Sequence, residues 1–228
     1  MKLVLLPGMD GTGRLLGPLV RALDGRLETR VLSYPANVVL GYAELTELVG
    51  KQLPADGDYA ILAESFAGPI GLALARRRLP GLRALVLVVT FAVPPRTPLL
   101  AATGLLPTEW ILSQPVPCWL ACKLMLGTDP PPDAQATFCE VIKIVTPNVI
   151  AARLRAGREL PDDRTPVDLP ALYIQAMQDR ILPDNVLDDL RPIVPRLRVE
   201  RVPGPHLVLD TQPDRCADLI TDFLGSLN

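Results

Sequence analysis

Short apolar runs alternate with segments of helical character along most of the chain. The short runs are rich in Val, Leu and Ile with little polar alternation, which is typical of strands buried on both faces. Strand and helix alternating in this way predict an α/β fold: a mostly parallel, doubly wound sheet of about six strands, with helices on both faces. The predicted strands are Leu3–Leu6, Arg30–Ser33, Tyr59–Ala63, Ala84–Thr90, Ala171–Ala176 and Arg198–Val202. The helices predicted between them are Leu15–Leu23, Tyr42–Leu53, Phe66–Arg77, Asn185–Leu190 and Arg215–Leu227.

One interval, residues 92–165, breaks this alternation. It has no clear strand and many prolines, and its helical segments are predicted at Cys118–Leu126, Asp133–Ile144 and Asn148–Leu160. We therefore expect an α/β core formed by residues 1–91 and 166–228, with residues 92–165 inserted as a helical cap or lid.

The first part of this cap is nearly uncharged. Between Thr97 and Cys122 the only charged residue is Glu109, and both tryptophans of the chain, Trp110 and Trp119, lie there. Most apolar side chains of such a segment pack the cap onto the core. Those that face a cleft would form an apolar substrate pocket, and we expect Trp110 and Trp119 to contribute to it.

Composition and charge narrow the class of protein. The hydrophobic fraction is 49% and the formal net charge is -2, so the chain is globular and lacks the basic face of a nucleic-acid-binding protein. The longest apolar runs have strand length, which argues against a membrane span. Only four apolar residues follow Lys2 before Pro7, too few for a secretory signal, so we expect a cytoplasmic location.

The four cysteines are Cys118, Cys122, Cys139 and Cys216. Without an export signal we expect them to be reduced and buried rather than bridged. Cys118 and Cys122 are four residues apart, a spacing that suits one face of a helix. Because zinc needs four ligands at defined spacings and the chain has one histidine, we expect no metal site and no cofactor.

Ser65 occupies a position that suits a catalytic nucleophile. It lies between the predicted strand that ends at Ala63 and the predicted helix from Phe66. A nucleophile elbow needs a strained turn there and small residues two before and two after the serine, and Ala63 and Ala67 meet that need. A serine at this position is also a common helix N-cap.

The loop after the first strand is rich in glycine, from Gly8 through Gly11 to Gly13. Such a loop can aim backbone N–H groups at an anion. In an acyl-transfer enzyme the anion is the oxygen of the tetrahedral intermediate, and the two donors would be Met9 N–H and Phe66 N–H. A dinucleotide-binding loop is the alternative, but it requires an acidic residue at the end of the second strand, where the sequence has Ser33 and Tyr34.

Asp179 and His206 follow the fifth and sixth predicted strands. His206 is the only histidine of the chain, and histidine is the side chain that titrates near neutral pH. Asp179 would accept a hydrogen bond from its Nδ1 and fix the tautomer. Each residue also has a structural interpretation, as a turn aspartate or a surface histidine. Ser65, Asp179 and His206 in this chain order, each at the carboxyl end of a parallel strand, together favour a catalytic triad.

These landmarks resemble those of α/β-hydrolase-fold proteins over essentially the whole chain. The matching segments are Leu-Pro-Gly-Met-Asp-Gly-Thr-Gly, Glu-Ser-Phe-Ala-Gly, Asp-Arg-Ile-Leu-Pro and Gly-Pro-His followed by Gln-Pro-Asp. The first two also resemble the hydrolase-like segment of plant phytyl ester synthases, which are acyltransferases. The resemblance implies Ser65 as nucleophile, Asp179 as acid, His206 as base, and Met9 and Phe66 as oxyanion donors. The chain departs from the family at Pro7, where many members have histidine, and at the alanines that replace the elbow glycines.

We therefore expect a serine carboxylic-ester hydrolase that forms an acyl-enzyme on small-to-medium apolar esters, with a small-molecule ester as its partner. Two alternatives remain at this point. The same triad could serve a thioesterase or an acyltransferase, and the same fold could be a binding protein without activity.

Overall fold

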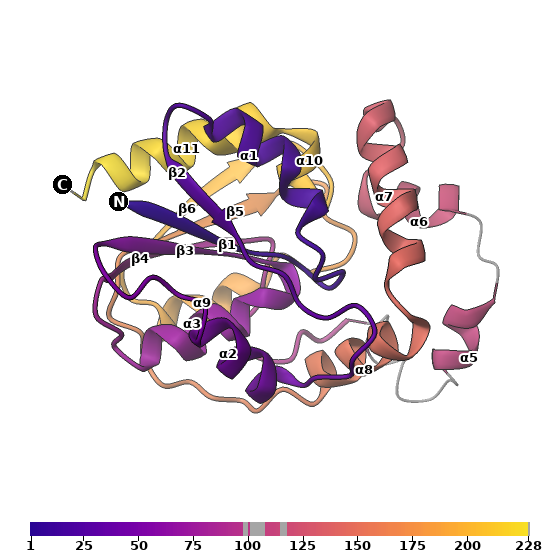
Figure 1. The fold of residues 1–228 in the computed structure, drawn as a ribbon, viewed down its shortest axis with the longest axis horizontal. Coiled ribbons are helices and arrows are strands. Elements are labelled where there is room, and N and C mark those ends of the chain that lie inside the picture. Colours follow the sequence, from indigo (N-terminus) through magenta and orange to yellow (C-terminus); the bar gives the residue numbers. More distant parts are fainter. Residues whose placement is uncertain (98–99, 101–107, 115–117, 228) are drawn as a thin grey trace.

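Six parallel strands form a single sheet in the computed structural model, which describes residues 1–97, 100, 108–114 and 118–227 (Figure 1). The strand order is β2-β1-β3-β4-β5-β6, and each neighbouring pair is parallel. This confirms the predicted fold class. The strands are β1 (Lys2–Leu6), β2 (Glu28–Val31), β3 (Tyr59–Glu64), β4 (Leu82–Val88), β5 (Ala171–Ala176) and β6 (Leu197–Val202).

The strand order reverses between β1 and β3. The chain leaves β1 for the edge strand β2, returns to the other side of β1 as β3, and then proceeds to β6. Loops diverge where an open parallel sheet reverses, and ligands bind in the crevice left at the carboxyl ends of the strands. The loop at residues 7–13 and the turn at Ser65 both leave the sheet at this point.

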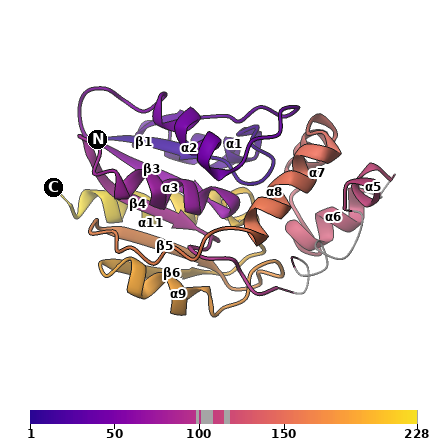
Figure 2. The same cartoon turned by 90° about the horizontal axis from the view of Figure 1, so that it is seen from below.

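Two layers of helices cover the sheet and enclose two separate cores. One face is covered by α1, α10 and α11, and the opposite face by α2, α3 and α9 (Figures 1 and 2). Along β3, Ala60 and Leu62 join the first core, whereas Ile61 and Ala63 join the second, because side chains alternate between the faces of a strand. These helices are α1 (Gly17–Leu23), α2 (Tyr42–Gly50), α3 (Gly68–Arg76), α9 (Val186–Ile193), α10 (Val208–Thr211) and α11 (Pro213–Gly225).

The segment between β4 and β5 is helical in its described residues. Its helices are α5 (Thr108–Ser113), α6 (Cys118–Met125), α7 (Pro132–Ile144) and α8 (Pro147–Arg158). They lie beyond the carboxyl ends of the strands, with α8 nearest the sheet (Figures 1 and 2). The three predicted helices are confirmed, and α5 was not predicted. The division into a core and a cap at residues 92–165 stays a prediction.

The edge strand β2 starts and ends two residues earlier than predicted. The prediction followed the apolar pair Val31 and Leu32, but β2 pairs only with β1 and its side chains are mostly exposed. Apolar residues therefore do not mark the limits of this strand. Among the described residues, no helix combines the length and the apolar character needed to cross a membrane.

The expectation that all four cysteines are reduced is wrong for two of them. A disulfide joins Cys118 on α6 to Cys139 on α7, whereas Cys122 and Cys216 are free and buried. The two bridged residues are 21 positions apart, on helices that pack against each other. The sequence spacing does not reveal this pairing, because it depends on how α6 and α7 meet.

Gly68, the first residue of α3, lies in very close contact with Thr90. A Cβ atom at Gly68 would lie 1.9 Å from Thr90 Oγ1 and 2.8 Å from Thr90 Cγ2. A fully buried threonine has little room to move, since Thr90 is 0% exposed. Position 68 therefore requires glycine. The sequence analysis asked for a small residue at position 67, which is Ala67, and did not single out Gly68.

Gly68→Ala should destabilise the fold by about 1–3 kcal/mol, because overpacking displaces Thr90 and the start of α3. Thermal unfolding measures this as a lower Tm. The control is Gly225→Ala, where nothing lies within 4 Å of the new methyl group. Equal melting temperatures for the two variants would contradict the proposed clash.

Candidate active site

Ser65 occupies a strained turn at the carboxyl end of β3. Its φ angle is 48°, a left-handed conformation that costs a residue with a side chain about 1–3 kcal/mol. The chain continues through the 3-10 turn Ser65–Ala67 into α3. The Thr90 hydroxyl donates a hydrogen bond to the Ser65 carbonyl and helps to hold this turn. The arrangement is the strand–turn–helix expected for a nucleophile elbow.

His206 bridges Ser65 and Asp179. His206 Nε2 lies 2.8 Å from Ser65 Oγ, and His206 Nδ1 lies 2.8 Å from Asp179 Oδ2. A carboxylate only accepts hydrogen bonds, so Nδ1 carries the proton and Nε2 is left to accept the Ser65 hydroxyl. The imidazole is almost completely buried, at 1% exposure. The structure thus brings these three predicted residues into one hydrogen-bonded chain.

The carboxylate of Asp179 is oriented by its own loop. Its Oδ1 accepts backbone hydrogen bonds from Ile181 N–H at 2.7 Å and Leu182 N–H at 3.1 Å, which leaves Oδ2 for His206. Gln178, which sequence analysis did not single out, joins this loop to the one after β6. Its backbone N–H donates to the Gly204 carbonyl at 2.9 Å, and its side-chain oxygen accepts from Gly204 N–H.

Met9 and Phe66 lie beside Ser65, as their predicted role requires. Both line a small cavity of about 50 Å³ that includes Ser65. A Cβ atom at Gly8 would lie 3.6 Å from Ser65 Cβ, so the loop after β1 passes directly beside the serine. The remaining lining is mainly apolar and comes from Phe91, Pro95, Thr97, Leu100, Arg153, Leu154, Gly157, Ile181 and Leu182.

Trp110 and Trp119 lie elsewhere. Their side chains are 64% and 61% exposed, and neither is among the residues that line the cavity beside Ser65. Hydrophobicity and position in the cap were the only grounds for selecting them. An uncharged stretch does not indicate which of its side chains faces a pocket, because that depends on how each helix is rotated.

Arg153 joins α8 to the backbone that follows β1 and β2. From α8, its guanidinium donates hydrogen bonds to the carbonyl oxygens of Met9 (2.7 Å), Asp10 (3.0 Å) and Pro35 (2.9 Å). It also lies over the Tyr34 ring, 5.7 Å from its centroid, and is 1% exposed. Sequence analysis missed this residue because nothing distinguishes it from other arginines of α8. Arg153 thus binds the backbone directly after the Met9 N–H, a predicted oxyanion donor.

Two further carboxyl groups are buried near the site. Burial raises the pKa of Glu64 to about 8, an effect increased by Asp10 and partly offset by the Gly8 N–H. Burial likewise raises the pKa of Asp210 to about 9, with Glu64 and Asp10 adding to the effect. Glu64 directly precedes Ser65, and Asp210 lies four residues after His206, in α10. Both pKa values lie above 7, so burial favours the protonated form of both groups near neutral pH.

The raised pKa of Glu64 predicts a pH-dependent stability. The unfolded chain releases this proton near 4.5 and the folded chain near 8, so the folded state binds more protons between these values. Stability should therefore fall with rising pH, by about 1.4 kcal/mol per pH unit from this group, and level off above its folded pKa. Glu64→Gln should reduce that slope, whereas Glu109→Gln, at an exposed position, should keep it. Urea unfolding between about pH 5 and 8 measures both, and an unchanged slope in Glu64→Gln would contradict this assignment.

Comparison with known proteins places the geometry in a fold family. No protein-family model matches the chain, and no curated protein matches it in sequence.

Solved structures do match the fold of this chain. A membrane phospholipase A described as a bacterial virulence factor is 17% identical with a TM-score of 0.81, over 99% of this chain and 79% of its own. An esterase from Thermogutta terrifontis is 19% identical with a TM-score of 0.78, over 100% of this chain and 90% of its own. A thioesterase from the prodiginine pathway of Streptomyces coelicolor is 21% identical with a TM-score of 0.69, over 100% of this chain and 85% of its own. The parallel sheet, its helical layers and these structural matches together show that this chain has the α/β-hydrolase fold.

Proposed function

We propose that the protein is a serine hydrolase of small carboxylic esters, in which Ser65, Asp179 and His206 form the catalytic triad. The observation that carries this proposal is the pair of 2.8 Å contacts that link Ser65 Oγ through the imidazole to Asp179. Such a chain is the arrangement by which a base activates a serine hydroxyl. The structural neighbours support hydrolysis as the class of reaction, since their descriptions name an esterase, a phospholipase and a thioesterase.

The proposed reaction begins with proton transfer from Ser65 Oγ to His206 Nε2 while Oγ attacks the ester carbonyl. The negative charge that develops on the carbonyl oxygen is stabilised by Met9 N–H and Phe66 N–H. The imidazolium, held by Asp179, then protonates the leaving alcohol, and an acyl-enzyme remains on Ser65. His206 next removes a proton from water as the water attacks the acyl-enzyme. It returns this proton to Ser65 Oγ as the bond to the acyl group breaks, which releases the acid and restores the free serine.

Arg153 supports this reaction by position. Its hydrogen bond to the Met9 carbonyl limits rotation of the loop that presents the Met9 N–H. Preorganised donors are effective because they need not reorient as the oxyanion forms. Arg153 is thus a positioning residue in the proposal and not a catalytic one.

The dimensions of the cavity support a short acyl group. About 50 Å³ of apolar space adjoins Ser65, which is small for a ligand site, so we propose short-to-medium acyl chains as substrates. The alternative dinucleotide site receives no support, because Arg153 and Tyr34 already cover the glycine-rich loop. A Cβ atom at Gly11 would lie 2.8 Å from Arg153 Nη1 and 2.9 Å from Tyr34 Cδ2.

A second candidate reaction is thioester hydrolysis or acyl transfer by the same triad, favoured by the thioesterase among the structural neighbours. Rates measured on an ester and a thioester with the same acyl group distinguish thioester hydrolysis from ester hydrolysis. Analysis of the products formed in dilute alcohol distinguishes acyl transfer from hydrolysis. The cytoplasmic location stays a prediction, which cell fractionation would test.

Ser65→Ala should abolish labelling by a fluorophosphonate probe and lower hydrolysis of p-nitrophenyl acetate by about 10³-fold or more, because the acyl-enzyme cannot form. Asp179→Asn should keep the fold but lower kcat by about 10⁴-fold, since an amide favours the wrong imidazole tautomer. Ser33→Ala, an exposed serine beyond β2, is the matched control. Parental labelling and turnover in Ser65→Ala would refute the mechanism, and labelling of the parent without turnover would favour a binding protein.

Leu154→Ala should enlarge the acyl cavity and shift the preference from acetyl and butyryl esters toward longer chains, because Leu154 lines the space beside Ser65. A series of p-nitrophenyl esters of increasing length measures kcat/KM for each acyl group. Trp119→Ala should leave this profile unchanged, since its indole is exposed. The reverse pattern, a shift only in Trp119→Ala, would place the acyl group under α6 and contradict the cavity assignment.

A further inference from the structure

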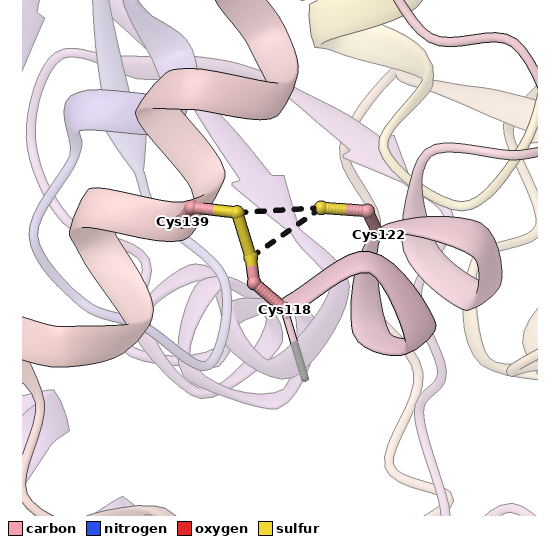
Figure 3. The surroundings of a disulfide bond; sticks show 3 residues. All are labelled: Cys118, Cys122 and Cys139. Atoms are coloured by element: carbon pink, nitrogen blue, oxygen red, sulfur yellow. Dashed lines mark hydrogen bonds between the residues drawn. A yellow bond between two sulfur atoms is a disulfide. The ribbon is translucent and has the colours of Figure 1, made fainter. Parts of the chain in front are cut away.

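Three of the four cysteines meet in the cap, apart from the proposed catalytic site. Cys118 and Cys122 lie one turn apart on α6, and Cys139 faces them from α7 (Figure 3). Cys122 Sγ lies 3.6 Å from Cys118 Sγ and 3.7 Å from Cys139 Sγ. The three sulfur atoms therefore form a triangle, one side of which is the Cys118–Cys139 disulfide.

This triangle is poorly arranged for thiol–disulfide exchange. An attacking thiolate displaces one sulfur from the other, so it must approach along the line of the S–S bond. Cys122 is almost equally distant from both sulfurs and thus lies beside the bond. The cluster in Figure 3 shows the same sideways placement. An arrangement of three sulfurs around a common point is what a ligand to all three would use.

The spacing suits three thiolates around one ion. Metal–sulfur bonds of about 2.3 Å place the sulfurs about 4 Å apart in a planar three-coordinate site. Two sides of the triangle, at 3.6 and 3.7 Å, are already close to this value. The third requires the disulfide to be reduced. The Cα atoms of Cys118 and Cys139 lie 5.9 Å apart, so rotation of the two side chains can separate the sulfurs without moving α6 from α7.

We propose that Cys118, Cys122 and Cys139, once reduced, bind a single thiophilic d¹⁰ cation of the Cu(I) type in three-coordinate geometry. Thiolate ligands select soft cations such as Cu(I), and the only histidine of the chain is held by Asp179 and Ser65. Among the described residues, the group of potential ligands at this place has these three members. Three ligands fit Cu(I) better than zinc, which is almost always four-coordinate in structural sites.

The two states of the cluster are related by a balanced reaction. A dithiol or a phosphine gives two electrons to the Cys118–Cys139 disulfide, which takes up two protons and becomes two thiols, while the reductant is oxidised. The cation then displaces the thiol protons as the thiolates bind. Cys122 is a free thiol beside the disulfide and is 3% exposed. Reduction thus converts a disulfide that joins α6 to α7 into a metal-binding site that joins the same helices.

The test is a Cu(I) competition titration of the full chain. Protein reduced with a phosphine, freed of excess reductant and kept anaerobic, is mixed with the Cu(I) complex of a chromophoric chelator. We expect one Cu(I) per chain to transfer to the protein, with a new ultraviolet band for thiolate-to-copper charge transfer. The disulfide form, which has two free thiols, should compete far less well. A reduced chain that takes no Cu(I) from the chelator would overturn the proposal.

Single variants identify the ligands. Cys122→Ser should weaken binding by more than about 100-fold, the upper range for loss of an outer-shell partner. This variant keeps Cys118 and Cys139 and should still form their disulfide, which shows that α6 and α7 remain folded together. Cys139→Ser should weaken binding equally. Cys216→Ser, in the core between the sheet and α11, should leave binding unchanged. Parental affinity in Cys122→Ser, or lost binding in Cys216→Ser, would refute the three-cysteine site, and neither result depends on ester hydrolysis.

Discussion

The turn at Ser65 is the constraint on which the proposed site depends. A serine with a φ of 48° is held there because α3 must start immediately after β3, with Gly68 against Thr90. The hydrogen bond to the Ser65 carbonyl comes from Thr90, two residues after the end of β4, so the segments that follow two neighbouring strands fix one backbone conformation. The strain lifts the hydroxyl above the sheet, where His206 can reach it. Local strain is thus offset by packing, a pattern common at functional sites.

The helix α8 supports the sheet edge through Arg153. This buried guanidinium donates to the carbonyl oxygens of Met9 and Asp10 in the loop after β1 and of Pro35 after β2, and buried polar groups of this kind require hydrogen-bond partners. The same side chain lines the cavity beside Ser65. At the end of α6, the Met125 carbonyl accepts a hydrogen bond from Leu207 N–H at 3.0 Å, so α6 contacts the residue next to His206. Residues of α6 and α8 therefore contact both ends of the proposed catalytic arrangement.

Neutral buried carboxyl groups explain how several acidic residues can lie around one site. Glu64 and Asp210, if ionised, would place two more negative charges in a region of low polarity, and each raises the cost of ionising its neighbours. The fold instead retains their protons. Asp179 has different surroundings, since its side chain accepts hydrogen bonds from two backbone N–H groups and lies 2.8 Å from His206 Nδ1.

The fold class and the three proposed catalytic residues could be predicted from the sequence, because buried parallel strands are continuous apolar runs and all parallel strands end at one edge of a sheet. Ser65, Asp179 and His206 each follow such a run, so their convergence could be inferred without coordinates. The contacts of Arg153, the exposure of Trp110 and Trp119, and the meeting of Cys118, Cys122 and Cys139 became visible with the coordinates. Each of these depends on how a cap helix is rotated and packed. That rotation is set by contacts between residues far apart in the chain, which local periodicity does not encode.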